Sequence, residues 1–257
     1  MVRKIVFTLL ACLSLNAHAG IEGDGTNYLA GSSESFSWAT SSGDVSIACW
    51  FYFENASTTA TFRYAFAMLT SSSGDLLAFS WDNTTAGDQF AWIGKDTGGY
   101  NAYQYSPEPS TGTWHHMGIT VDGDATTNNV EIYIDGSSDT PGTNDLGTRD
   151  ATGGSIDLFG DGFGGSVFDD RLAECAVWDI ELAASDFTDM WNGRPPNAVE
   201  QADLVWYWKG ATESTIATVT GGTLTETGGG NLTTAASDPT IITVPPLKRA
   251  HIHRQSQ

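Results

Sequence analysis

The feature that most constrains this chain is a two-residue alternation in a stretch near its middle. Residues 112–123 read GTWHHMGITVDG, and the apolar side chains of MGITV recur at every second position. Successive side chains of a β-strand point to opposite faces of a sheet, so this period predicts a strand. His115 then shares a face with the apolar residues, which should look into the core, while Trp114 and His116 lie on the other face.

This alternation also bears on whether the two adjacent histidines form a metal site. Because His115 and His116 face away from each other, they cannot both bind one ion, and a metal centre needs three or four ligands at a workable spacing. The other histidines after the first 19 residues are His251 and His253, near the end of the chain. The segment is therefore predicted to be one wall of a sheet and not a reaction centre.

Strand-like segments recur at short spacing along the rest of the chain. They cover residues 44–54, 63–70, 75–82, 89–95, 100–106, 113–122, 129–136, 155–161, 171–179, 203–210 and 240–246. One short helix is expected at residues 184–192, because Phe187, Met190 and Trp191 follow helical spacing and an Asn-Gly pair comes next. Many short strands with a single helix predict an all-β sandwich.

The chain divides into three parts. Residues 1–19 read as an export signal peptide, with a basic start, a short apolar run and the small-x-small site Ala17-His18-Ala19. Residues 20–246 are expected to form one β-sandwich domain, and residues 247–257 a flexible tail. The expected product is secreted, periplasmic or displayed on a cell surface, without a transmembrane segment.

The charge of the chain limits its partners. Its 11 basic and 31 acidic residues give a formal net charge of −20. A chain this acidic will not bind nucleic acid by neutralising phosphates, whereas it suits cation binding and high solubility. Cys49 and Cys175 remain after removal of the leader, and in an exported protein they either form one bridge or stay as two buried thiols.

Several segments together resemble one family. GTWHHMGITVDG followed by VEIYIDG looks like the central hairpin of laminin G-like, concanavalin A-like domains of the lectin/glucanase superfamily. GDGTNYLAG (23–31), VSIACWFYF (45–53), DDRLAECAVWDIELAASDFTDMWNG and DLVWYWKG with TIITVPP resemble its other strands in the same order. The resemblance implies a jelly-roll sandwich of two antiparallel sheets. It also implies that the second and late strands are neighbours, which would bring Cys49 and Cys175 within bridging distance.

Because the resembled superfamily includes glucanases, the acidic residues of this chain could include a catalytic pair. A retaining glycosidase needs two carboxylates about 5 Å apart, which related glucanases supply as Glu-x-Asp-x-x-Glu on one strand. The nearest string here begins at Glu22 and ends in Asn27, in the Gly-rich opening. Glu131 and Asp135 are four apart and could share a face, but a sheet-surface acid and an Asp-Gly turn residue are the ordinary explanation for them. We therefore expect no catalytic residues.

Calcium is the cofactor that the residues suit best, since Ca²⁺ prefers oxygen ligands and members of the resembled family often bind it at the rim of the sandwich. Asp24, in the opening strand, and Asp169 or Asp170, before the late strand, are the candidate ligands.

Carbohydrate binding would use aromatic rings against sugar C–H surfaces, with polar groups to orient hydroxyls. The candidate ligand-binding residues are Trp81, Asn83, Trp92, Tyr100, Tyr103, Tyr105 and Phe163. Core packing is the competing explanation for aromatic residues in strands.

The sequence thus predicts an exported, non-catalytic module that recognises carbohydrate or another extracellular surface, with calcium assistance. The alternatives are a structural or adhesive subunit of an extracellular or virion-like assembly and, less favoured, a glycoside hydrolase on the same fold.

Overall fold

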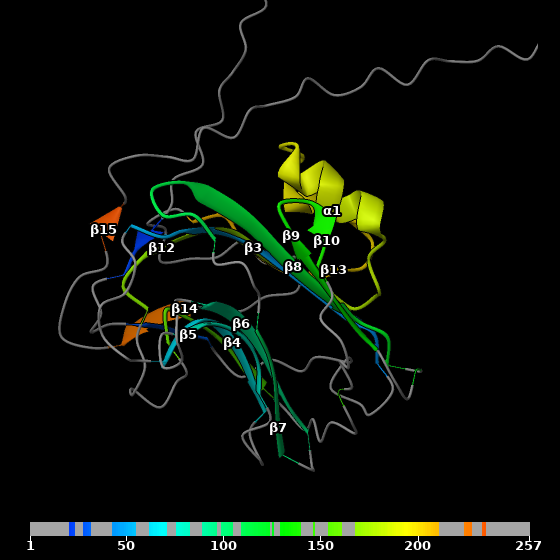
Figure 1. Cartoon of the computed structure of the whole chain (residues 1–257), viewed down its shortest axis with the longest axis horizontal. Coiled ribbons are helices and arrows are strands. Elements are labelled where there is room, and N and C mark those ends of the chain that lie inside the picture. The colour runs from blue at the N-terminus through cyan, green and yellow to red at the C-terminus, as the bar shows by residue number, and fades with distance from the viewer. Residues whose placement is uncertain are drawn as a thin grey trace, which may run out of the picture.

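A computed structural model of the chain describes residues 21–23, 28–31, 43–54, 62–70, 76–82, 89–96, 99–104, 109–123, 125, 129–139, 146, 154–160, 168–210, 224–227 and 233–234. These residues form two antiparallel sheets that face each other, with one helix on the outer side of the first sheet (Figure 1). The jelly-roll sandwich expected from the sequence is confirmed.

The first sheet has the strand order β10-β9-β8-β3-β12-β1-β15, and β13 also pairs with β12. Its strands are β1 (Ile21–Glu22), β3 (Val45–Tyr52), β8 (Trp114–Val121), β9 (Val130–Ile134), β10 (Ser137–Ser138), β12 (Arg171–Trp178), β13 (Leu204–Trp208) and β15 (Thr233–Thr234). Strands far apart in the sequence are neighbours here, as β3 lies between β8 and β12.

The second sheet has the order β14-β2-β11-β4-β5-β6-β7. Its strands are β2 (Tyr28–Gly31), β4 (Phe62–Thr70), β5 (Leu76–Asp82), β6 (Gln89–Asp96), β7 (Gly99–Gln104), β11 (Gly154–Leu158) and β14 (Leu224–Thr227). The sequence did not single out β14 or β15, and the expected strand at 240–246 lies outside the described residues.

The core lies between the two sheets and is built by alternation. In β3 and β8, Phe51 and Ile119 are among the odd-numbered residues that face it, and both are fully buried. From the second sheet, Phe66 and Phe79 meet them, and the rings of Phe51 and Phe79 pack edge to face with centroids 5.5 Å apart. The alternation predicted for residues 114–121 is therefore confirmed.

Helix α1 (Ala184–Trp191) matches the helix expected at 184–192 and covers the outer face of the first sheet (Figure 1). Phe187 and Met190 are buried there, and Phe187 stacks on Tyr133 with centroids 4.1 Å apart. Gly118 lies below Phe187, where a Cβ would come within 2.2 Å of the ring. A short 3-10 helix, η2 (Pro196–Ala198), leads on to β13.

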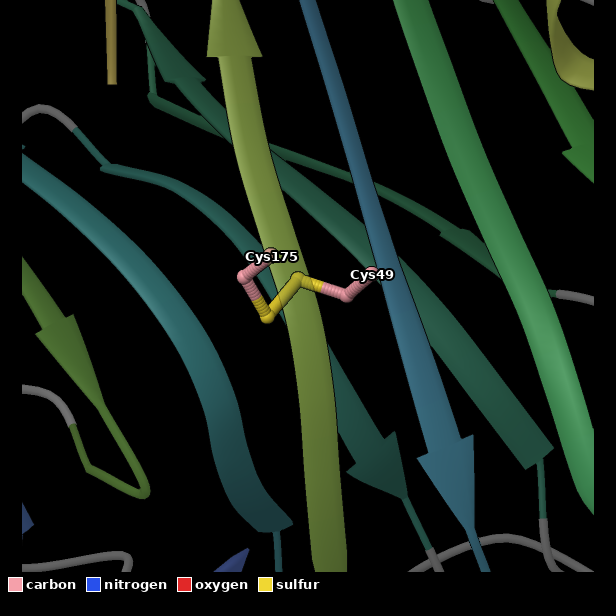
Figure 2. Close-up of a disulfide and its surroundings, with 2 residues drawn as sticks. All are labelled: Cys49 and Cys175. Atoms are coloured by element: carbon pink, nitrogen blue, oxygen red, sulfur yellow. A yellow bond between two sulfur atoms is a disulfide. The ribbon is translucent and has the colours of Figure 1, made fainter. Parts of the chain in front are cut away.

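Cys49 of β3 and Cys175 of β12 form a disulfide between neighbouring strands (Figure 2). The bridge depends on a β-bulge, since the register of β12 against β3 shifts between Ala173 and Ala176 and Glu174 has a positive φ of 51°. Simple alternation from the buried Leu172 would turn Cys175 to the outer face. The extra residue reverses the alternation and turns Cys175 toward the core and Cys49.

Candidate functional site

His115 and His116 lie on opposite faces of β8, as the alternation predicts. His115 is at the core side beside the ring of Phe53, and His116 is at the outer side beside Trp50. Within the described residues there is no group of three or more His, Cys, Asp or Glu side chains that is placed to hold a metal ion. The two imidazoles therefore belong to two separate environments.

His115 lies in an arrangement with the outline of a Ser-His-Asp triad. Its Nδ1 is 2.9 Å from Asp135 Oδ2, and its Nε2 is 3.2 Å from the hydroxyl oxygen of Ser110. In a nucleophilic triad, Nε2 must accept the hydroxyl proton. Here Nε2 is also 2.9 Å from the backbone carbonyl oxygen of Ser110. A carbonyl at that distance needs a donor, so Nε2 carries a hydrogen and is not available as a base.

The carbonyl and the carboxylate together select the charged imidazole. Nδ1–H donates to Asp135 and Nε2–H donates to the Ser110 carbonyl. Burial by itself lowers the pKa of His115, but the hydrogen bond and charge of Asp135, with the Ser110 carbonyl, outweigh it and raise the pKa. Asp135 is fixed in turn, because the His116 N–H donates to its Oδ1. This group holds the rim segment 110–112 and the β9–β10 turn against β8.

His116 has the opposite character. It is completely buried, and its ring meets the edge of Trp50 with centroids 5.1 Å apart. Neither ring nitrogen has a hydrogen-bond partner in the described part of the chain. Burial lowers its pKa to about 4, so the imidazole is neutral at neutral pH.

The carboxylates of Glu131 and Asp135 take part in two separate local contacts. Glu131 accepts a hydrogen bond of 2.5 Å from the Tyr133 hydroxyl, and Asp135 holds His115. Glu174, which is buried, accepts a 2.6 Å hydrogen bond from Tyr207. These acids serve the packing of the first sheet.

The candidate ligand-binding aromatics fall on three strands of the second sheet. Trp81 is in β5 opposite Phe90, and Tyr100 and Tyr103 are in β7. Trp92 of β6 is only 2% exposed and belongs to the core, so its assignment to ligand binding is corrected. The remaining candidates Asn83, Tyr105 and Phe163 lie outside the described residues.

A charged cluster marks the rim where calcium was expected. Asp169 pairs with Arg63, and Glu54 pairs with Arg171. The Glu54 N–H donates to Asp170 Oδ1 at 2.9 Å. Burial raises the pKa of Asp170 to about 7, the carboxylates of Asp169 and Glu54 add to this rise, and the Glu54 N–H and Arg63 offset part of it.

The opening of the domain reaches the same rim. The Gly23 N–H donates to the backbone carbonyl of Asp170 at 2.9 Å, so the chain reaches Asp170 one residue before Asp24. Asp24 itself lies outside the described residues. Of the described carboxylates in this rim cluster, Asp170 is the one that forms no ion pair, and the described side chains by themselves do not make a calcium site.

Comparisons with known proteins agree with this architecture. A laminin G family model, described as concanavalin A-like lectin/glucanases superfamily, matches residues 23–186. No curated protein sequence matches the chain significantly. None of the helices in the described part of the chain has the length and apolar character needed to cross a membrane.

Solved structures with similar folds come from several sources. A protein described as a "putative carbohydrate binding protein" from Bacteroides ovatus ATCC 8483 has a TM-score of 0.60 at 16% identity, covering 88% of this chain and 62% of its own. A heptameric SAP-like pentraxin from Limulus polyphemus has a TM-score of 0.49 at 15% identity, covering 67% of this chain and 81% of its own. At this identity the likeness concerns the fold, and this chain spans only part of the Bacteroides protein.

Proposed function

The chain belongs to the concanavalin A-like lectin/glucanases superfamily, and on that premise we propose that it is a non-catalytic module that binds carbohydrate or another extracellular surface. The family description includes both binding and hydrolytic members. The choice between them depends on how the titratable side chains of this chain are used.

One observation carries the proposal: the imidazole of His115 and the carboxylates of Glu131, Asp135 and Glu174 are each engaged in hydrogen bonds within the first sheet and at its rim. His115 donates from both ring nitrogens, Asp135 accepts one of these bonds, Glu131 accepts from Tyr133, and Glu174 accepts from Tyr207. A catalytic acid or base needs an accessible proton position beside substrate. The description of the similar Bacteroides ovatus protein as carbohydrate-binding points in the same direction.

Export from the cell is part of the proposal. The Cys49–Cys175 disulfide fits an extracellular domain, since such bonds persist in oxidising compartments and are rare in the cytosol. The leader expected at residues 1–19 would deliver the chain to such a compartment.

Calcium assistance is the finer part of the proposal and requires Asp24 to join Asp170 at the rim. The hydrogen bond from Gly23 to Asp170 supports this placement, and a cation would relieve the repulsion between Asp170 and its acidic neighbours. A rise in melting temperature on adding millimolar Ca²⁺ to EDTA-treated protein is expected. An unchanged melting temperature would remove calcium from the proposal and leave the binding function standing.

A glycan array probed with and without EDTA tests the function directly. We expect binding to a defined set of glycans and no product when the same glycans are incubated with the protein and analysed for hydrolysis. Released sugars would instead identify a hydrolase. Failure to bind any glycan, with large assemblies seen by light scattering, would favour the structural or adhesive alternative.

A further inference from the structure

The outer face of the first sheet carries a row of aromatic and charged side chains that the sequence does not reveal. The registers place Arg171 of β12 opposite Tyr52 of β3, and Tyr52 opposite Trp114 of β8. Residues directly opposite each other on neighbouring strands share a face. Three strands that are far apart in the chain therefore present these three side chains side by side.

The members of this row contact one another. The rings of Tyr52 and Trp114 have centroids 5.5 Å apart, and the Arg171 guanidinium lies 4.8 Å from the centroid of Tyr52. Arg171 also pairs with Glu54, just beyond the end of β3. All four side chains are partly exposed. The contacts fix their orientations, so little side-chain freedom would be lost on binding a ligand.

Trp191, at the end of α1, extends this surface. It stacks on Trp50, which is two residues before Tyr52 on the same face of β3, with centroids 5.4 Å apart and planes 24° apart. Trp191 is 36% exposed and is the exposed large hydrophobic side chain among the described residues. Because one face of its indole lies on Trp50, the opposite face and the edge supply the exposed area. Helix α1 thus covers one part of the sheet and leaves the row uncovered by any other described element.

We infer that Tyr52, Trp114, Arg171 and Trp191, called here the outer aromatic surface, bind a neutral glycan chain. This rests on the proposed function and assigns it to a site on the opposite sheet from Trp81 and Tyr103. Aromatic rings that are partly exposed and fixed in orientation can stack on the C–H faces of sugar rings, while the Arg171–Glu54 pair offers a donor and an acceptor to hydroxyl groups.

Charge selects the class of glycan. Arg171 is neutralised by Glu54, and the chain carries a net charge of −20. A uronic-acid or sulfated polymer would be repelled, whereas a neutral chain meets no electrostatic penalty. A protein partner would need about 800 Å² of surface from each side, with a buried hydrophobic centre. A narrow row of half-buried rings with a charged end fits a linear sugar chain better.

Native affinity electrophoresis of the full chain tests this inference. Neutral polysaccharides (hydroxyethyl cellulose, laminarin and galactomannan) are cast into separate gels, with alginate as the anionic probe. Trp114→Ala and Trp191→Ala are compared with Asn197→Ala, an exposed neutral position outside the row, as the control, and Trp191→Phe is the conservative variant. Trp81→Ala tests the candidate site on the other sheet. None of these substitutions changes charge, so mobility without polysaccharide stays the same. Circular dichroism melts identify any variant that has not folded.

We expect a neutral polysaccharide to retard the wild type, and retardation to persist at high salt. Trp191→Ala and Trp114→Ala should each weaken it about five- to ten-fold, with Trp191→Phe intermediate and Asn197→Ala unchanged. Undiminished binding by folded Trp191→Ala and Trp114→Ala, or loss only in Trp81→Ala, would overturn this site but keep the proposed function. Retardation by alginate alone would overturn the choice of a neutral ligand. A wild type that no glycan retards would overturn both proposals for carbohydrate.

Discussion

The disulfide between Cys49 and Cys175 gives the sharpest quantitative prediction. The bridge joins the two central strands β3 and β12 and closes a loop with a sequence separation of 126 residues. In the chain-entropy account, a cross-link stabilises the folded state by restricting the unfolded chain. For a loop of this length the predicted stabilisation is about 5 kcal/mol at 25 °C.

This magnitude converts into a large change in melting temperature. A change of about 1 kcal/mol in the free energy of unfolding shifts the melting temperature of a domain of this size by about 2–4 °C. Loss of the bridge should therefore lower the melting temperature by about 10–20 °C. Both cysteines are fully buried, so a reductant should reach the sulfur atoms only after the domain opens. The folded protein is therefore expected to resist dithiothreitol at 25 °C.

The assay compares oxidised protein with protein that has been unfolded, reduced and refolded under reductant. These two samples contain the same side chains, so neither has a cavity of the kind that a Cys→Ala substitution leaves. The difference between their denaturant curves therefore measures the contribution of the cross-link alone. The Cys49→Ala/Cys175→Ala variant serves as the control, because reductant should leave its curve unchanged. A difference below about 1 kcal/mol between the oxidised and reduced proteins would contradict the entropy argument.

Two further predictions concern the faces of β8. His115→Gln should cost about 1.5–3 kcal/mol at pH 6, because two hydrogen bonds of a charged group are lost. Since the folded pKa of His115 is raised, its contribution is complete below the unfolded value of about 6.5 and is lost as the pH rises through the folded pKa. Urea titrations from pH 6 to 9 should show a steeper decline for the wild type than for the variant, and parallel declines would refute the charged imidazole. Gly118→Ala should destabilise by about 1–3 kcal/mol by pushing Phe187 away, and adding Phe187→Leu should recover part of the loss; an unaffected urea midpoint for Gly118→Ala would show that the helix is not packed as described.

Local patterns in the sequence were sufficient to predict the longer strands and the helix, but not β14 or β15. Alternation over residues 113–122 and helical spacing at Phe187, Met190 and Trp191 depend only on which residues are near each other in the chain. The segments at 44–54 and 171–179 were predicted for the same reason and correspond to β3 and β12. Strand β15 (Thr233–Thr234) was not predicted, because a strand of two residues is too short to show a periodic pattern.

Residue roles were harder to predict. In the sequence, the residues around Trp92 resemble those around the other aromatic residues of the hairpins. Only the packing of the two sheets shows that Trp92 is in the core. Ser110 and Asp135 meet His115 because a rim segment and a turn fold onto the end of β8. No spacing rule connects these three positions in the sequence.

The sequence by itself determined the all-β character, the helix and the two faces of the central strand, since side-chain alternation is a property of the local backbone. Tertiary structure decided which faces are covered and which side chains meet. The bulge at Glu174 turns Cys175 toward Cys49, and the register of β12, β3 and β8 brings Arg171, Tyr52 and Trp114 into one row. Register and burial are set by contacts between segments more than 50 residues apart, and these contacts exist only once the two sheets have packed.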